Sequence, residues 1–292
     1  MSVVKSNAHQ VGQSVTATNN MTWYQPSTPD GTVRLGVGNA GATTADVITA
    51  SSTGITVPSM SSANTFGFKN RLIDAGFIIN QRGYTSGTAL SSGSYAHDRW
   101  KAGSSGCTYT FTQGSNGVPI TITITAGALQ QVIEGCNVAE GGTYTLSWQG
   151  TAQASINGGA ASASPLTVTG VTAGANMTIQ FNTGTVYEPQ LEVGSATTSF
   201  DFRAYGTELA LCQRYYQTLP VQSGISFNLV SWLYSGTNNW ATWSFKQSFR
   251  AAPTISGGNG FTGSWSTTEV AYFANGAAVF VSSATINASA EL

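Results

Sequence analysis

Charged side chains are scarce in this chain of 292 residues, and their scarcity excludes several classes of partner. Lys, Arg, Asp and Glu together make up 8% of the sequence, whereas roughly 25% is usual for a soluble protein. The net charge is −1 and the 11 basic residues are scattered, so the clustered cations that bind nucleic acid or anionic lipid are missing. We therefore expect neither nucleic-acid binding nor membrane insertion.

Cysteine and histidine are also rare. Cys107, Cys136 and Cys212 are odd in number, far apart and without CxxC spacing, which argues against a disulfide framework and a zinc site. We expect buried or half-buried thiols in a protein made in a reducing compartment. With His9 and His97 as the only histidines, and no GxSxG or DxDxDG motif, we expect no cofactor and no metal cluster. A calcium ion held by carbonyl groups and one carboxylate stays open.

Long apolar runs are missing as well. No segment approaches the roughly 20 residues of a membrane span, and the N-terminal MSVVKSNAHQVGQS lacks the apolar core of a secretory signal. Hydrophobic residues nevertheless make up 41% of the chain and aromatics 11%. This composition predicts a folded, soluble protein with a neutral polar surface rather than a disordered one.

Short alternating segments between Gly-rich turns predict an all-β fold. In PITITITAG, Ile and Thr alternate strictly, and β-branched residues suit a pleated surface. Near the N-terminus, Pro29-Asp30-Gly31 marks a turn before a strand through Val33, Leu35 and Val37. Further predicted strands lie in DVITASSTGITVPS, CTYTFTQ, TYTLSWQG, PLTVTGVTAG, NMTIQFNTG, SFNLVSWLYSG, NWATWSFKQSF, EVAYFANG and AAVFVSSATINA. Their spacing indicates a central β-sandwich or jelly roll followed by a smaller β domain, in which Asn275-Gly276 marks a hairpin.

The stretch GTELALCQRYYQTLP differs from its surroundings and predicts a short helix over residues 207–218. Thr207 is the expected N-cap, Glu208 suits the first turn, and Pro220 ends the segment. The helix carries apolar residues on more than one face, so it needs neighbours on several sides to be stable.

Four residues of that stretch raise the question whether it is a site or a structural joint. Leu209, Cys212 and Tyr216 would share one helix face, and Tyr215 lies on another. Free cysteines are most often simply buried. We interpret Cys212 as a small buried residue rather than a nucleophile, and all four residues as packing residues of a joint between two β domains.

Several stretches occur in an order that resembles a known family. NRLIDAGFIINQRG, YAHDRW, YEPQLEVGSATTSFDFRAYGTELALCQRYYQ and FRAAPTI are similar to a module of bacteriophage and prophage tail-fibre and receptor-binding proteins. The resemblance covers residues 70–255, and residues 187–217 are its most specific part. Members commonly carry Glu where this chain has Asp201. The first and last strands also resemble carbohydrate-binding jelly rolls, and the resemblance puts Arg99 and Trp100 in the sandwich core.

The resemblance implies a virion appendage, usually a homotrimer, that contacts the bacterial surface. We expect a virion-attachment segment over residues 1–68, with a linker at 59–65, a carbohydrate-binding-like sandwich over 69–206, and the helix with a β tip domain over 207–292. The implied partners are further copies of the chain, other tail or baseplate proteins bound through the N-terminal segment, and a host surface glycan such as lipopolysaccharide. The implied location is the tail fibre of the virion, after synthesis in the host cytoplasm.

Residues 232–243, WLYSGTNNWATW, form the candidate glycan site. Aromatic faces can stack on pyranose rings while neighbouring amides hydrogen-bond the hydroxyl groups. On a hairpin with an exposed Asn turn, the candidate side chains are Trp232, Tyr234, Asn238, Asn239, Trp240 and Trp243. In the alternative interpretation, these rings form the core of the small domain or the trimer axis.

Enzymatic alternatives depend on few residues. A glycoside hydrolase needs two carboxyl groups close together, and Glu188 and Glu192 in YEPQLEVG are the closest candidates. We favour structural roles in which they bond backbone N–H groups or Arg203, and we expect His97, next to Asp98, in a strand or loop. The sequence thus predicts a non-enzymatic binding protein. The alternatives are a tail or baseplate adaptor that does not bind the receptor, and a secreted glycan-acting enzyme.

Overall fold

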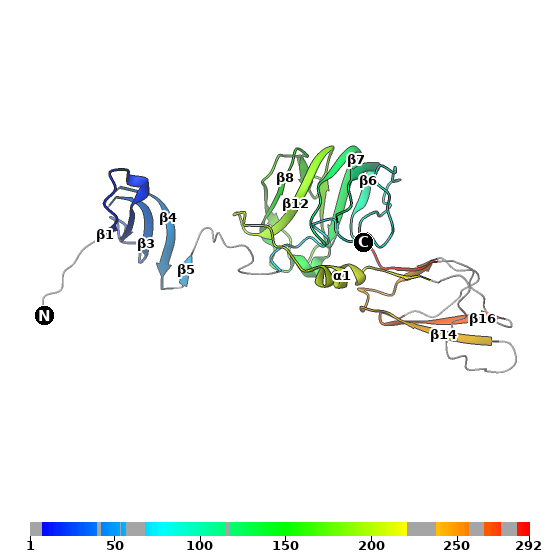
Figure 1. Ribbon diagram of the computed structural model, residues 1–292. Coiled ribbons are helices and arrows are strands. Elements are labelled where there is room, and N and C mark those ends of the chain that lie inside the picture. The colour runs from blue at the N-terminus through cyan, green and yellow to red at the C-terminus, as the bar shows by residue number, and fades with distance from the viewer. Residues whose placement is uncertain are drawn as a thin grey trace. The chain divides into compact units, whose positions relative to one another are not determined.

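The computed structural model describes residues 8–39, 42–52, 54–56, 68–114, 117–220, 238–256, 266–275 and 285–292 (Figure 1). The predicted all-β class is confirmed, with 43% of residues in strands and 8% in helices. The chain divides into two compact units, residues 1–63 with 196–199 and residues 64–195 with 200–292. This division places no boundary between residues 206 and 207, where the sequence predicts that the tip domain begins.

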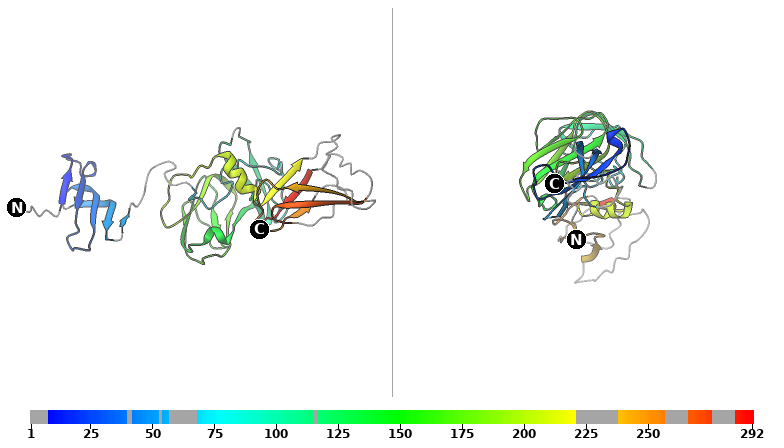
Figure 2. Two further views of the ribbon diagram at one scale, coloured as in Figure 1. Left: turned by 90° about the horizontal axis from the view of Figure 1, so that it is seen from below. Right: turned by 90° about the vertical axis from the view of Figure 1, so that its left-hand side faces the viewer.

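The first unit holds a five-stranded antiparallel sheet whose strands follow one another in chain order. They are β1 (Ala8–Val11), β2 (Met21–Tyr24), β3 (Val33–Asn39), β4 (Ala42–Ser51) and β5 (Gly54–Thr56) (Figure 2). A 3-10 turn over Ala17–Asn19 precedes β2. The predicted strand through Val33, Leu35 and Val37 is confirmed as β3, and the predicted linker at 59–65 lies outside the described residues.

The second unit contains a nearly closed sheet that encloses the main core. Its strands are β6 (Lys101–Phe111), β7 (Ile122–Ile133), β8 (Gly142–Gln149), β9 (Ala154–Ile156), β10 (Leu166–Val171), β11 (Met177–Phe181) and β12 (Gly184–Val193). A 3-10 turn, Gly135–Val138, follows β7. Strand β12 joins the two halves, because its first residues pair with β7 and its later ones with β8. A bulge between Tyr187 and Gln190 makes this change of partner possible.

The alternating pattern explains which residues fill the core. Along β7, Ile122 and Ile124 are buried while Thr123 between them is half-buried, as a period of two requires. Trp100 is fully buried, and its ring centroid lies 4.8 Å from that of Phe77. The expected burial of Arg99 and Trp100 is confirmed, with exposed fractions of 1% and 0%.

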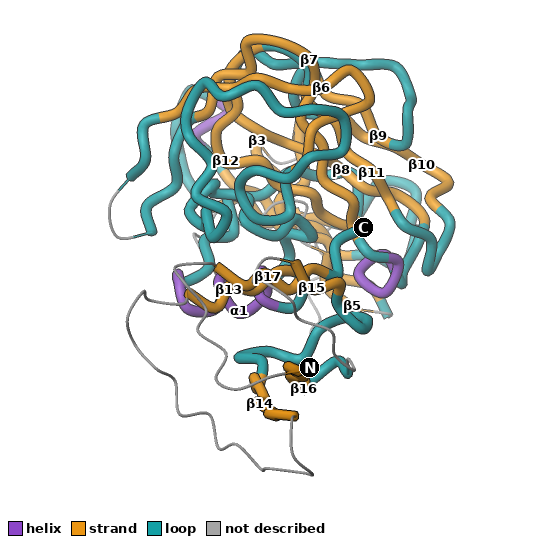
Figure 3. Tube along the Cα trace, turned by 90° about the vertical axis from the view of Figure 1, so that its right-hand side faces the viewer, coloured by secondary structure: helices purple, strands orange, loops and turns teal. Residues whose placement is uncertain are grey.

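The remaining elements begin with a nine-residue helix, α1 (Tyr205–Gln213). They continue with β13 (Tyr216–Pro220), β14 (Asn238–Ser244), β15 (Thr254–Ser256), β16 (Glu269–Asn275) and β17 (Thr285–Ser289). Strands β13, β17 and β15 form one antiparallel sheet beside α1, and β14 pairs with β16 in another (Figure 3). Within the described ranges, no helix has the length and apolar character needed to cross a membrane.

The predicted helix over residues 207–218 is wrong in its limits. Ala204 is its N-cap in place of Thr207, and the helix ends at Gln213 with Arg214 as its C-cap. Tyr216 instead opens β13 and pairs with Ser289. Aromatic residues suit strands, and pairing with β17 outweighs a helical pattern that is weak in so short a segment.

The predicted turn at Asn238 and Asn239 is also wrong. Both residues lie in β14, where they pair with Asn275 and Ala274 of β16. Backbone pairing over the whole of β14 outweighs the turn preference of asparagine. Of the predicted hairpin at Asn275-Gly276, Asn275 is the last residue of β16, and Gly276 lies outside the described ranges.

Candidate functional site

The six predicted glycan-binding residues are only partly covered by the structure. Trp232 and Tyr234 lie outside the described residues. Asn238, Asn239, Trp240 and Trp243 all belong to β14. In the ladder with β16, Trp240 is opposite Phe273, and Trp243 is opposite Val270. The backbone therefore brings aromatic and amide residues from two distant segments onto one short ribbon.

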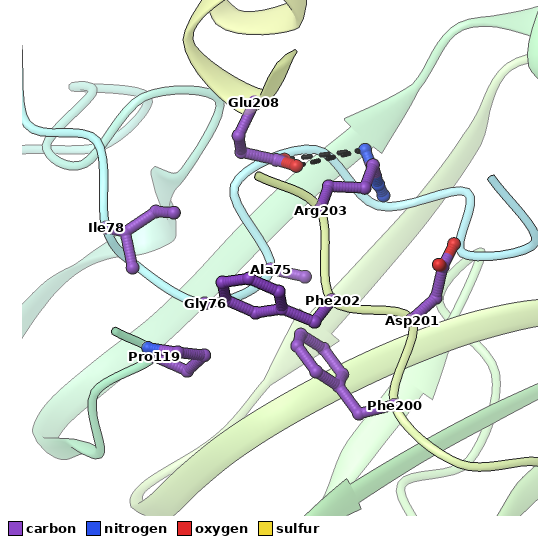
Figure 4. A pocket seen from close by; sticks show the side chains of 9 residues that line it. All are labelled: Ala75, Gly76, Ile78, Pro119, Phe200, Asp201, Phe202, Arg203 and Glu208. Atoms are coloured by element: carbon purple, nitrogen blue, oxygen red, sulfur yellow. Dashed lines mark hydrogen bonds and ion pairs between the residues drawn. The ribbon is translucent and has the colours of Figure 1, made fainter. Parts of the chain in front are cut away.

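A shallow pocket opens where the segment before α1 meets the 75–78 loop (Figure 4). It encloses about 250 Å³ with the solvent at its mouth included, and its lining includes Ile78, Pro119, Phe200, Asp201, Phe202, Arg203 and Glu208. The volume open to the centre of a water molecule is only about 10 Å³, far below the roughly 300–1,000 Å³ of small-molecule sites. This pocket therefore has room for about one water molecule and cannot enclose a sugar.

The charged groups of this pocket hold two separate segments of the chain in contact. The Arg203 guanidinium donates to the carbonyl oxygens of Asn70 and Leu72 at 3.0 and 2.5 Å and forms a buried ion pair with Glu208 at 3.3 Å. Glu208 in turn accepts the backbone N–H of Asp74. Burial raises the pKa of Glu208, although Arg203 opposes the shift. These contacts tie the 70–74 segment to the first turn of α1.

Asp201 likewise links segments that are distant in the sequence. One of its carboxylate oxygens accepts the backbone N–H of Asn70 at 3.2 Å, and its own N–H donates to Gln190 at 2.6 Å. Its other oxygen, like Nε of Arg203, is buried without a hydrogen-bond partner in the structure. A single acceptor oxygen left over beside an ion pair does not make a catalytic pair.

Two aromatic rings beside the pocket face solvent. Phe202 is 45% exposed and lines the pocket, and Tyr205 is 48% exposed and packs over Gly117. Neither ring is among the aromatic candidates that the sequence predicts. The signal for both lies in SFDFRAYGTE, where aromatic residues stand next to polar ones.

The four residues interpreted as a joint lie in contact with the sandwich unit's own loops and strands. Cys212 and Tyr215 are buried with Ile73, Ile78 and Ile79, and Leu209 packs against this cluster. The guanidinium carbon of Arg99 lies 3.6 Å from the centroid of the Tyr215 ring. That of Arg82 lies equally close to Tyr216. Each tyrosine thus stacks on an arginine from the loop that precedes β6.

Glu134, at the end of β7, holds the same region from another side. It accepts hydrogen bonds from the Tyr215 hydroxyl at 2.9 Å and from Arg214 and Arg250 at 3.1 Å each. Partial burial raises the pKa of Glu134, but these bonds outweigh burial and lower the pKa to about 2. The carboxylate therefore stays ionised and bridges β7, α1 and the segment before β15.

A buried ion network anchors the segment after β17. Arg82 pairs with Asp98 at 2.8 Å and with Glu291 at 3.0 Å, and Arg99 also pairs with Glu291. Burial raises the pKa of Asp98 to about 6 against the opposing effect of Arg82. Lys101 donates to the carbonyl oxygen of Leu292 at 2.7 Å. Residues between 191 and 209 positions apart in sequence are thereby held together.

The three cysteines are free, but they differ in exposure. Cys107 and Cys212 are buried, and burial raises the pKa of both thiols. A buried thiol with a raised pKa is a poor nucleophile, which agrees with a packing role for Cys212. The expectation that all three would be buried or half-buried is wrong for Cys136, which is exposed on the turn after β7.

The acidic pair considered for hydrolysis lies on β12. Glu188 is at the bulge with a positive φ of 50° and accepts a hydrogen bond from Gln149 at 3.1 Å. Glu192 is buried in the ladder with β8, opposite Thr145. The bulge thus gives the two carboxylates different surroundings. Arg203, the partner suggested for them, forms its ion pair with Glu208.

His97 lies in a loop, as expected, and is fully buried among aromatic rings. Its Nδ1 lies 2.6 Å from the Tyr109 hydroxyl, and its ring contacts Phe111 edge-on at 4.6 Å. Burial lowers the pKa of His97 from 6.5 to about 4. The folded protein therefore keeps this imidazole neutral at pH values where an unfolded histidine binds a proton.

This shift predicts a loss of stability in acid that begins near neutrality. The unfolded state takes up the proton below about pH 6.5 and the folded state only below about pH 4. The contribution of His97 is therefore complete above pH 6.5 and falls by about 3 kcal/mol on the way to pH 4. We expect the difference in unfolding free energy between wild type and His97→Asn to shrink by that amount between pH 7 and pH 4. Urea unfolding of both proteins at the same series of pH values measures this difference, and the titration of Asp98 contributes equally to both. A difference in unfolding free energy that stays constant from pH 7 to pH 4 would contradict the expectation.

Neither the pocket nor the joint offers a metal centre of the usual kind. Among the described residues, no group of three or more His, Cys, Asp or Glu side chains is arranged to hold an ion. No family model, curated protein or solved structure matches this chain.

Proposed function

We propose that this protein is a homotrimeric tail-fibre protein that attaches a virion to a bacterial surface glycan such as lipopolysaccharide, by binding and without catalysis. The resemblance over residues 187–217 motivates the proposal. The structural observation that carries it is a division of roles: charged groups fasten the chain, while the aromatic rings of Phe202 and Tyr205 face solvent.

The acidic residues illustrate this division. Each acidic side chain that the structure describes, from Asp30 to Glu291, takes part in a contact within the chain, usually a hydrogen bond or an ion pair. Hydrolysis of a glycoside needs one carboxyl group that donates a proton and another that is free to attack. A binding site needs only aromatic faces and amides; the sequence of β14 contains both kinds of residue, and Phe202 exposes its ring at the pocket.

The binding proposed here is weak at each site and gains strength from repetition. Several copies of the same tip held on one fibre convert the second and third contacts into intramolecular events. This gain in apparent affinity requires that the tips be held in a fixed orientation. Stacking of Arg82 and Arg99 on Tyr216 and Tyr215 supports a firm base for the strands that follow.

The test is binding of the labelled full-length protein to Gram-negative cells and to purified lipopolysaccharide. We expect saturable binding that Trp240→Ala and Phe202→Ala each weaken about tenfold, in line with the loss of an aromatic anchor. Thr242→Ala, in the same strand as Trp240, is the control and should bind as wild type does. Release of reducing sugar from the glycan would favour an enzyme instead. Absence of binding, with the chain found inside the tail or baseplate, would favour the adaptor alternative.

A further inference from the structure

The sheet of β1–β5 separates its side chains into an apolar and a polar face. Residues opposite each other in a ladder point to the same side of a sheet, and sides alternate along each strand. Two ladder rows of one face are Trp23–Leu35–Ile48 and Val33–Ala50–Ile55. All six residues are apolar, and they come from four of the five strands.

The opposite face is polar and already covered by its own side chains. Tyr24 and Arg34 are ladder partners there, and Asp46 lies opposite Gly36. The Tyr24 hydroxyl donates to Asp46 at 2.5 Å, and Arg34 pairs with Asp46 at 3.0 Å. A Cβ on Gly36 would lie 3.1 Å from the Tyr24 ring, so the polar side chains pack closely over that glycine. Thr22, on the same face, is fully buried.

The apolar face, in contrast, is exposed or half-buried along both rows. Ile55 is 72% exposed, Val33 49% and Trp23 41%, and Val11 on the edge strand is 56% exposed. Among the described residues 8–56, no hydrophobic side chain is buried. An isolated sheet with one apolar face needs another layer for stability, and a unit of about 60 residues is marginal even with a core. Another layer must therefore cover this face.

We propose that the apolar face of β1–β5 is the surface through which copies of this chain associate with one another. Besides His9, which is opposite Trp23, the face carries no titratable group among its described side chains. Arg34, Asp30 and Asp46 are paired with one another through contacts away from that face. A neutral face offers no charge pattern that would select a foreign partner, and it meets no like-charge repulsion when it meets itself.

The size of the face suits such a contact. Five strands about 4.8 Å apart, each contributing about five residues at roughly 3.4 Å, cover on the order of 400 Å² in outline. Three such faces turned toward a common threefold axis, with their side chains interdigitated, remove on the order of 1,200 Å² from water in total, comparable with the minimum for a specific interface. This inference deepens the proposed homotrimeric fibre by locating its contact between copies, and it rests on that proposal only for the identity of the partner.

The test uses the full-length chain and two variants that add one carboxylate to opposite faces of the sheet. In sedimentation velocity between about 1 and 100 μM, we expect wild type to run as a multiple of 30.3 kDa. Trp23→Glu should weaken association at least about 30-fold, as loss of a central aromatic anchor does. Thr49→Glu, whose residue is the ladder partner of Arg34 on the polar face, should associate within about threefold of wild type.

Hydrogen exchange provides a second readout that needs no variant. In wild type, the amides of β2 and β3 should exchange faster on dilution to concentrations where the copies separate, whereas those of β7 and β8 should not change. The proposal is overturned if wild type sediments at 30.3 kDa throughout, since the face then belongs to another partner. It is also overturned if wild type associates but Trp23→Glu associates equally well. Glycan binding by wild type in either case would leave the proposed glycan-binding role standing, whereas a monomeric wild type would remove the trimer from that proposal.

Discussion

Replacing Glu291 with glutamine is expected to lower the free energy of unfolding by about 3–5 kcal/mol. Glu291 is 6% exposed and is shared by Arg99, which is 1% exposed, and by Arg82. Arg82 keeps Asp98 in the variant, but Arg99 loses the one acidic partner that it has among the described residues and stays buried as an unpaired cation. Removing one member of a buried pair has a cost of this size because the other charge is left without water.

Urea unfolding at matched protein concentration measures this loss, since assembly makes stability depend on concentration. The control is Glu140→Gln, which removes the same charge from the Arg71–Glu140 pair, whose side chains are 25% and 47% exposed. A pair so exposed is screened by water, and its loss should cost less than about 1 kcal/mol. Equal effects of the two variants would mean that Glu291 does not anchor the segment after β17.

Tyr215→Ala is expected to cost about 3–5 kcal/mol, as truncation of a large buried aromatic ring usually does. The ring is 1% exposed, stacks on Arg99, and packs in the cluster with Cys212. Tyr215→Phe keeps the ring and removes only the hydroxyl that donates to Glu134. Because that bond goes to a charged acceptor, its loss should cost about 1.5–3 kcal/mol.

The pH dependence of stability should also differ between Tyr215→Phe and wild type. The Tyr215 hydroxyl is one of three donors that lower the pKa of Glu134 to about 2, so its loss should raise that pKa. The stability that Glu134 provides is present above about pH 4.5 and lost as the pH falls toward 2. In Tyr215→Phe, this loss should be complete at a higher pH than in wild type. Tyr205→Ala, which truncates a half-exposed tyrosine at the start of α1, is the matched control and should change stability by less than 1 kcal/mol.

These contacts give the segment around α1 a defined place in the molecule. Two arginines from the loop before β6 stack on two adjacent tyrosines, a glutamate from the end of β7 accepts a hydrogen bond from one tyrosine, and a glutamate after β17 pairs with both arginines. If the proposed function is right, the strands beyond β13 are presented from this base. Variants at the joint should then also weaken binding, because they should allow the tip to unfold locally under conditions in which the sandwich core is still folded.

The sequence by itself determined the all-β class and most strand positions. Alternation of apolar and polar residues is a local property, so PITITITAG and the run through Val33, Leu35 and Val37 predicted strands where β7 and β3 lie. The same alternation indicated that β3 has one apolar side. It could not indicate whether that side is covered, because cover depends on which strands become neighbours and in which register.

The tertiary structure alone decided the features on which the site depends. The helix ends at Gln213 because pairing of Tyr216 with Ser289, far along the chain, outweighs a local preference. Asn238 and Asn239 lie in a strand for the same reason. Glu291 forms ion pairs with Arg82 and Arg99, and no pattern in the sequence predicts an ion pair between residues so far apart. Local patterns fix elements because they depend on neighbouring residues, whereas buried charges and bare faces depend on how distant segments pack.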